Sequence, residues 1–365
     1  MQILVGTKLK NWLKLTGRHF REIPADKLAM ALKLTITTYF RNDRYEAKEL
    51  QAYGDKIRNA VIHPQPVFVL GHWRSGTSHL HQLLSLGKQF TFPTVFDIYS
   101  PHSFLYTAPM LEEKMAKAGE QKRPMDQMKI KFNDPGEDEF ALAVMSLMSP
   151  VLAWVFPKST AFYDRYLTFE EVDQKEIDYW KEQFLYFMKK LNTRNPKPVI
   201  LKSPQHTARI KLLREMFPRA RFIHVHRNPY DVYNSTVKLY EKTVRPMQMT
   251  DSIDANQMRE GIIGRYRNMY RNFFTESALL PADQFLDVSY EELDRQPLQL
   301  IERIFRHFGF EDYASYKPLL EAHLESIGSY KKNKYSPVAE PWLSRINREW
   351  AFAFDKWNYP LNREN

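Results

Sequence analysis

The sequence predicts an α/β protein in which an open, mostly parallel sheet is flanked by helices and preceded by a helical extension. Three short apolar runs support this prediction, each followed by polar residues and then by helical spacing; they start at Val67, Val199 and Phe222. Strands that alternate with helices pair in parallel, because a parallel connection needs the length of a crossover helix. Ligands of such sheets bind beyond the carboxyl ends of the strands, so we expect the functional residues to follow these runs.

Composition limits the classes of protein to which the chain can belong. With 365 residues, 43% of them hydrophobic and 14% aromatic, the chain can bury a large core. No apolar stretch approaches the ~20 residues of a membrane span, and we expect no secretory signal at the start. Cysteine is absent, which excludes disulfides, thiolate nucleophiles and Cys-ligated zinc and suits a cytoplasmic location.

The net charge of +10 is concentrated near the N-terminus. Residues 1–63 contain twelve Lys and Arg against six Asp and Glu, whereas residues 64–312 and 313–365 are close to balance. Nucleic-acid-binding proteins carry a broad basic stripe, which this distribution does not provide. We therefore expect no nucleic-acid partner.

The stretch from Val67 to Leu80 has the pattern of a strand, a tight turn and the start of a helix. Gly71 and Gly76 bound the turn, which is called the anion loop below. A turn before a helix N-terminus binds anions, because free backbone N–H groups and the helix dipole face the same point. Further donors are the guanidinium of Arg74 and the hydroxyls of Ser75, Thr77 and Ser78.

The nucleotide P-loop has the same glycine spacing but needs a lysine where this chain has Thr77. That lysine reaches the terminal phosphates of ATP or GTP, so its replacement argues against an ordinary nucleotide site. The run Arg-Ser-Gly-Thr resembles instead the 5′-phosphosulfate loop of sulfotransferases that use 3′-phosphoadenosine 5′-phosphosulfate (PAPS). It is closer to the carbohydrate, tyrosyl-protein and bacterial branches than to the cytosolic one. The resemblance implies the P-loop-like sulfotransferase fold. It also implies that the loop and the start of the helix bind the cofactor, through Arg74, Ser75, Gly76, Thr77, Ser78 and His79. Cytosolic relatives have tryptophan at the position of His79.

A second piece of the predicted site follows the run that starts at Val199. The run is followed by Lys202-Ser-Pro-Gln-His206. Lys202 and His206 would lie beside the anion loop if this strand is a neighbour of the strand that starts at Val67. Cytosolic sulfotransferases carry Lys-x-His here, the lysine steadying the transferring group and the histidine acting as base. This chain keeps Lys202, has Pro204 at the histidine position, and carries His206 as in the bacterial branch. We therefore assign catalytic roles to Lys202 and His206, with His206 as our first choice of base because neutral imidazole suits proton removal near neutral pH.

A third piece resembles the part of sulfotransferases that holds the 3′-phosphate. Arg227 ends a predicted strand and Ser235 lies two turns along the next helix. Guanidinium binds phosphate bidentately, which agrees with this role. Tyr290 matches the residue near the adenine. Family members often close the 3′-phosphate site with a C-terminal basic stretch, for which the candidates are Lys331 and Lys332, although a solvated charged loop explains them equally well.

The acidic segment 134–139 comes directly before an apolar helical pattern. Helix capping explains it, with Asp134 at the N-cap, Pro135 at the first helical position and Glu137 at the third. An acidic cluster also occurs at this point in bacterial sulfotransferases, so the alternative is a catalytic role for Glu137 or Asp138 at the acceptor hydroxyl. Two further acid–base candidates are Asp97 and His102.

Two other segments bear on the partners of the protein. Residues 8–21 have the pattern of a basic amphipathic helix. Packing on the protein's own core is the simpler interpretation, and peripheral contact with an anionic membrane is the other. Aromatic and Met-rich stretches at 90–106 and 140–156 favour a lipophilic alcohol, such as a sterol or another lipid, over a carbohydrate as the acceptor.

Together these features predict one domain with a basic helical extension (1–63), an α/β core (64–312) and a C-terminal segment packed on that core (313–365). The expected reaction moves the sulfuryl group of PAPS to a small-molecule hydroxyl and leaves 3′-phosphoadenosine 5′-phosphate (PAP), with no metal. Such a transfer needs positioning and positive charge, here from Arg74 and Lys202, more than covalent chemistry. The alternatives are a P-loop-like kinase or NTPase and a non-catalytic nucleotide-binding module.

Overall fold

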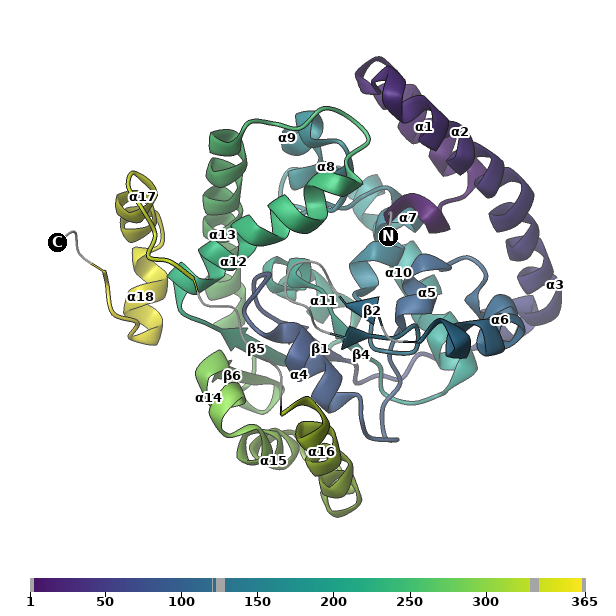
Figure 1. Ribbon diagram of the computed structural model, residues 1–365. Coiled ribbons are helices and arrows are strands. Elements are labelled where there is room, and N and C mark those ends of the chain that lie inside the picture. Colours follow the sequence, from purple (N-terminus) through teal and green to yellow (C-terminus); the bar gives the residue numbers. More distant parts are fainter. Residues whose placement is uncertain (1–2, 120, 123–128, 329–334, 363–365) are drawn as a thin grey trace.

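The computed structural model describes residues 3–119, 121–122, 129–328 and 335–362 (Figure 1). Its central sheet has four parallel strands in the order β4 (Ile200–Lys202), β1 (Val67–Leu70), β5 (Arg221–His226) and β6 (Phe285–Ser289). The predicted parallel sheet is confirmed, and the three apolar runs of the sequence form three of its strands. A separate antiparallel ribbon joins β2 (Gln121–Lys122) to β3 (Lys129–Ile130).

Helices cover both faces of the sheet. Side chains of β1 alternate between two cores, with Phe68 and Leu70 in the larger one and Val67 and Val69 in the smaller one. Burial of both faces is the reason that β1 is an unbroken apolar run. The smaller core is closed by α4 (Thr77–Leu84), α14 (Tyr290–Arg295), α15 (Pro297–Phe308) and α16 (Tyr313–Ile327). The larger core includes α10 (Gln174–Arg194), α11 (Ile210–Met216), α12 (Pro229–Leu239) and α13 (Ala255–Ser277).

The remaining helices surround this arrangement. The helices α5 (Val95–Tyr99) and α6 (Phe104–Ala118) precede the β2–β3 ribbon. The helices α7 (Asp138–Ser146), α8 (Leu152–Val155) and α9 (Thr160–Asp164) follow it. At the C-terminal end, α17 (Trp342–Glu349) and α18 (Ala351–Trp357) dock on α13, where the rings of Trp350 and Tyr266 stack at 3.8 Å. In the part of the chain that the structure describes, no helix has the length and apolar character needed to cross a membrane.

An N-terminal arm of three helices lies along one edge of the molecule (Figure 1): α1 (Leu9–His19), α2 (Leu28–Thr37) and α3 (Asp43–Asn59). The helix α1 packs on the larger core through Trp12 and Leu15, which are fully buried. The indole of Trp12 also donates to the hydroxyl of Thr35 at 2.7 Å, so α1 and α2 lie side by side. Packing on the protein therefore accounts for the apolar face of residues 8–21 except Leu13 and Phe20, which remain exposed.

The start of α7 differs from the predicted capping arrangement. The helix begins at Asp138, with Glu137 at the N-cap and no capping hydrogen bond from its side chain. Asp134 instead accepts from the backbone N–H of Lys131 at 2.7 Å, and Pro135 forms a bridge with Thr94. The prediction for Asp134, Pro135 and Glu137 was wrong, because local turn and bridge contacts hold residues 134–136 outside the helix. The change frees the carboxylate of Glu137 from a capping role.

Candidate active site

The anion loop connects β1 to α4 and depends on its two glycines. Gly71 has a φ of 139° and Gly76 a φ of 102°, both in the region that favours glycine. A Cβ atom on Gly71 would lie 2.5 Å from the carbonyl oxygen of Val225, and one on Gly76 would lie 2.5 Å from the ring of Tyr290. Close approach to β5 and to Tyr290 therefore requires glycine at both positions.

Hydrogen bonds fix the shape of the loop from within. The hydroxyl of Ser75 is buried and donates to the carbonyl of His72 at 2.8 Å, while the N–H of Gly71 donates to Thr207 at 2.7 Å. Thr77 is also buried at the start of α4. The side chains of Ser78 and His79, one and two residues further along α4, are half-buried.

The two halves of the predicted phosphate site meet at Ser235 of α12. Arg74 donates through Nε to the hydroxyl of Ser235 at 2.9 Å, and Arg227 donates to the carbonyl of Arg74 at 3.3 Å. The hydroxyl of Tyr335 donates to the same Ser235 oxygen at 2.8 Å. No sequence motif predicted a role for Tyr335. The available signal was its position directly after the basic stretch that contains Lys331 and Lys332. Both lysines lie outside the described residues.

Arg227 is held between an aromatic ring and a carboxylate. Its guanidinium lies 4.2 Å from the ring centroid of Tyr290 and 3.1 Å from Asp231, four residues along α12. Its Nε atom is buried, and none of the residues that the structure describes accepts a hydrogen bond from it. Arg227 and Tyr290 thus lie together beside Gly76.

The catalytic candidates of β4 lie next to the loop because β4 and β1 are neighbours. Lys202 is paired in the sheet with Val69 and is 3% exposed. Its ammonium donates to Ser78 at 3.1 Å and forms an ion pair with Glu137, whose side chain is 21% exposed. A partly exposed carboxylate and a buried cation therefore form an ion pair beside the anion loop.

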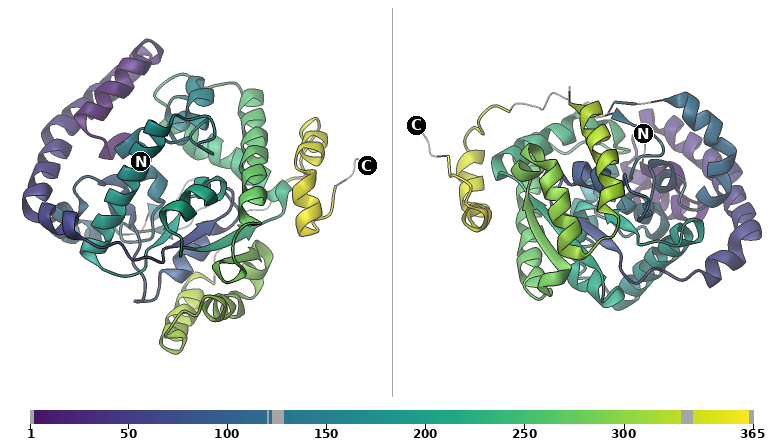
Figure 2. Two further views of the ribbon diagram at one scale, coloured as in Figure 1. Left: turned by 180° about the vertical axis from the view of Figure 1, so that it is seen from behind. Right: turned by 90° about the horizontal axis from the view of Figure 1, so that it is seen from below.

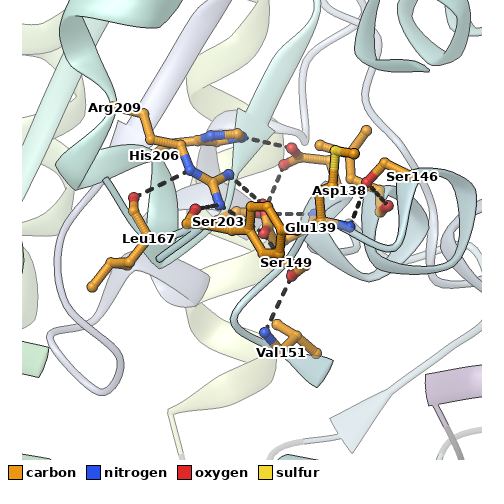
Figure 3. Close-up of polar contacts among 12 residues, drawn as sticks. Asp138, Glu139, Ser146, Ser149, Val151, Leu167, Ser203, His206 and Arg209 are labelled. Carbon is orange, nitrogen blue, oxygen red and sulfur yellow. Dashed lines mark hydrogen bonds and ion pairs between the residues drawn. The ribbon is translucent and has the colours of Figure 1, made fainter. Parts of the chain in front are cut away.

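His206 and Asp138 form a second pair (Figure 3). The distance between His206 Nε2 and Asp138 Oδ2 is 2.6 Å, and both side chains are fully buried. The imidazole stacks on Phe184 and meets the edge of Phe68. Burial raises the pKa of Asp138, but the charge of His206 and hydrogen bonds from His206 and Ser203 outweigh it, so that the pKa is lowered overall.

Below this pair, the N-terminal end of α7 is bound to the turn after β4. The guanidinium of Arg209 contacts both carboxylate oxygens of Glu139, at 2.7 and 3.0 Å, and the N–H of Glu139 donates to Ser203 at 2.9 Å (Figure 3). All three residues are fully buried. The sequence analysis missed this network, which fixes Glu137 and Asp138 relative to Lys202 and His206; its only signal was charged residues inside apolar stretches.

The other two acid–base candidates have structural partners. Asp97 accepts from the backbone N–H of Thr94 at 2.8 Å as part of a capping box at α5, and it binds Arg194 at 2.8 Å. His102 lies 3.7 Å from Glu46, and burial lowers its pKa well below the usual value. Neither lies among the loop contacts described above.

Aromatic rings from both predicted acceptor segments lie near Glu137 and the loop. Trp73 of the loop contacts Trp154, which contacts Phe140, which stacks on Tyr99, with ring centroids 5.9, 6.3 and 6.2 Å apart. The pKa of Tyr99 is raised to about 12 by burial and by the negative charge of Glu137. An apolar wall thus runs from the anion loop to the carboxylate.

Within the described residues, no group of three or more His, Cys, Asp or Glu is arranged to hold a metal ion. His224 and His226, which alternate along β5, have other contacts. His224 binds Asp287 at 2.8 Å, and His226 stacks on Trp357 at 4.8 Å.

A protein-family model matches most of this chain. Residues 66–314 match the model of the sulfotransferase family. The chain belongs to this family. The omega-hydroxy-beta-dihydromenaquinone-9 sulfotransferase Stf3 of Mycobacterium bovis is 32% identical over 362 residues, covering 97% of this chain and 90% of that protein. The Mycobacterium tuberculosis protein of the same name matches equally.

Solved structures show the same fold. The sulfotransferase STF9 from Mycobacterium avium superposes with a TM-score of 0.71 at 19% identity, covering 98% of both chains. The sulfotransferase STF1 from Mycobacterium tuberculosis gives a TM-score of 0.64 at 18% identity over 87% of this chain and 88% of that one. This sulfotransferase is therefore an enzyme whose family and fold were predicted from its loop and strand-end residues.

Proposed function

We propose that this sulfotransferase uses PAPS as the sulfuryl donor and a hydroxyl of a lipophilic small molecule as the acceptor. One observation carries the proposal: Arg74, Ser235 and Arg227 converge on the anion loop, next to the pair of Lys202 and Glu137. A donor with a 5′-phosphosulfate and a 3′-phosphate needs cationic groups at two ends, and a guanidinium binds each phosphate well.

The residues around the loop suit such a donor. The glycine at position 76 leaves room for the Tyr290 ring, and the buried Nε of Arg227 has no hydrogen-bond partner among the described residues. In this proposal Arg227, Ser235 and Tyr290 bind the 3′-phosphoadenosine part. The loop N–H groups, Arg74 and Lys202 face the sulfuryl group and stabilise the negative charge that develops on its leaving oxygen.

We assign the role of general base to Glu137 and a positioning role to His206. The sequence favoured His206 as base, but its imidazole is fully buried, stacked on Phe184 and bonded to Asp138. Glu137 is partly exposed and lies beside the aromatic wall and Lys202. In the transfer, the acceptor oxygen forms a bond to sulfur, its proton passes to Glu137, and the sulfur–oxygen bond to the 5′-phosphate breaks, releasing PAP.

The acceptor side of the proposal rests on the wall of Trp73, Trp154, Phe140 and Tyr99, which offers rings rather than the polar groove that a sugar polymer needs. The relative at 32% identity is named for a menaquinone derivative, a lipid-like alcohol, which agrees with this choice. A sterol or another lipid-like alcohol is therefore preferred to a carbohydrate.

Calorimetry with PAP and with ATP, each with and without Mg²⁺, tests the donor. Tight binding of PAP without Mg²⁺ supports the proposal, whereas Mg²⁺-dependent ATP binding would identify a kinase or NTPase instead. Incubation with labelled PAPS and a lipid extract or a sugar panel, followed by mass spectrometry, tests the acceptor. PAP binding with no transfer to any hydroxyl would favour a binding module.

A further inference from the structure

The N-terminal arm exposes large apolar side chains that the fold itself does not cover. Three of them belong to α2, whose ten residues carry a single charge, Lys33. A helix that is apolar nearly all round is normally buried on every side. One side of α2 is indeed packed: Leu34 is 5% exposed, and Thr35 accepts a hydrogen bond from Trp12 of α1.

The opposite side of α2 faces solvent. Leu28, Leu32 and Ile36 recur at intervals of four residues and are 50 to 60% exposed. The same side continues beyond the helix with two aromatic rings that touch each other edge to face. We call this surface, together with Leu13 of α1 and Phe20 directly after α1, the arm face: Leu13, Phe20, Leu28, Leu32, Ile36, Tyr39 and Phe40.

The arm face is larger than the scattered apolar residues of an ordinary surface. Its aromatic residues Phe20, Tyr39 and Phe40 are 69, 58 and 66% exposed. At ~150–250 Å² for a whole aromatic side chain, these three together expose roughly 300–500 Å². The arm extends at the edge of the molecule, away from the sheet, in both Figure 1 and the left view of Figure 2.

Positive charge dominates the exposed ionisable side chains of the same segment. Among residues 9–44, all of which the structure describes, Asp26 is the one exposed acid. The exposed cations of the same stretch are Lys10, Lys14, Arg18, Arg21, Lys33, Arg41 and Arg44. Exposed apolar side chains on a segment rich in exposed cations match an anionic bilayer, in which acyl chains lie beneath negative headgroups.

We propose that the arm face docks this enzyme on the surface of an anionic lipid bilayer. A second copy of the chain is a poorer occupant, because like cations on the two arms would repel each other across such an interface. Core packing was the simpler interpretation of residues 8–21 and membrane contact the alternative; the structure buries much of that segment and exposes further apolar side chains on α2 and directly after it. Docking does not depend on the donor or acceptor proposed above, since it is measured without turnover.

Flotation of the full-length protein with lipid vesicles tests the proposal. The protein should float with mixed phosphatidylglycerol and phosphatidylcholine vesicles, float much less with pure phosphatidylcholine, and release at high salt. The triple variant Leu32→Ser, Ile36→Ser and Phe40→Ser should weaken binding by at least about tenfold.

Two matched variants separate docking from general surface effects. Val61→Ser with Leu279→Ser alters residues that are 81 and 68% exposed outside the arm face, and it should leave flotation unchanged. The charge variant Lys10→Gln, Lys14→Gln and Lys33→Gln should weaken binding to anionic vesicles by about 100-fold. All replaced side chains are exposed, so circular dichroism and the thermal midpoint should match the wild type.

Three results would overturn the proposal. The first is a wild-type protein that does not float with anionic vesicles. The second is equal loss of flotation in the arm-face variant and in the Val61 and Leu279 control. The third is a wild-type dimer in sedimentation that the arm-face variant abolishes, with no vesicle binding by either; this would identify the arm face as a contact between copies.

Discussion

Lys202 and Glu137 form an ion pair at the carboxyl end of β4, and the same ammonium donates to Ser78 at the start of α4. The pair joins three elements that are far apart in the sequence. It brings the proposed base next to the residue that faces the sulfuryl group. Most of the chemistry that we propose depends on this contact, and it can be tested from both sides.

Replacing Glu137 by glutamine should abolish proton acceptance while keeping the shape of the side chain. We expect kcat to fall by roughly 10²–10⁴-fold, the usual contribution of a general base. PAP affinity, measured by calorimetry, should stay within a few-fold of wild type, since Glu137 does not contact Arg227 or Ser235. Unchanged kcat would contradict the assignment and return the role to His206 or Asp138.

His206→Gln tests the positioning role. The change removes the buried partner of the Asp138 carboxylate, so we expect a loss of about 3–5 kcal/mol in the free energy of unfolding. Activity should fall less than in Glu137→Gln once folded protein is compared. A matched control is His307→Gln, which alters a histidine of α15 on the other side of the sheet. A drop in kcat as large as that of Glu137→Gln, with unchanged stability, would identify His206 as the base.

Gly76→Ala tests the close approach of the anion loop to Tyr290. A Cβ there meets the tyrosine ring at 2.5 Å in a backbone conformation that disfavours alanine. We expect stability to fall by about 1–3 kcal/mol and PAP binding to weaken as Tyr290 is displaced. The control is Gly264→Ala in α13, which has open space around it and should be neutral or stabilising by up to about 1 kcal/mol. Equal effects of the two variants would show that the close contact between residue 76 and Tyr290 affects neither stability nor PAP binding.

The central sheet and the anion loop could be predicted because their signals are local. The run of β1, the two glycines and the start of α4 lie within a single short stretch. Lys202 ends β4, and Arg227 directly follows β5. Parallel pairing then brings these residues to one edge of the sheet. The strand pattern alone therefore located most of the candidate site.

The rest of the site depends on contacts that no local pattern specifies. Tyr335 reaches Ser235 across 100 residues, and Arg209 reaches Glu139 across 70. The burial of His206 follows from the 3₁₀ turn Pro204–Ala208, which directs the imidazole onto Phe184 rather than toward the loop. Sequence spacing predicted that His206 lies near Lys202 but could not predict that its side chain is fully buried.

Arg227→Ala tests recognition of the 3′-phosphate. Hydrogen bonds to a charged group contribute about 1.5–3 kcal/mol, so affinity for PAP should fall by roughly 10- to 100-fold. Affinity for adenosine 5′-phosphate, which lacks the 3′-phosphate, should change little. The control Arg267→Ala removes a half-exposed arginine that binds Glu349, away from the loop. If PAP and adenosine 5′-phosphate lose affinity equally, Arg227 does not contact the 3′-phosphate.

Two histidines buried near the anion loop make stability depend on pH. The pKa values of His72 and His81 are lowered to about 3, mainly by burial. Between pH 6.5 and 3 each is neutral in the folded protein and protonated in the unfolded chain, so acid favours unfolding by roughly 1.4 kcal/mol per pH unit for each histidine. The free energy of unfolding in urea should therefore fall by roughly 2 kcal/mol per histidine between pH 7.5 and pH 5. His81→Gln removes one of the two contributions and should flatten the pH profile by that amount; a profile with the wild-type slope would mean that His81 is protonated in the folded protein.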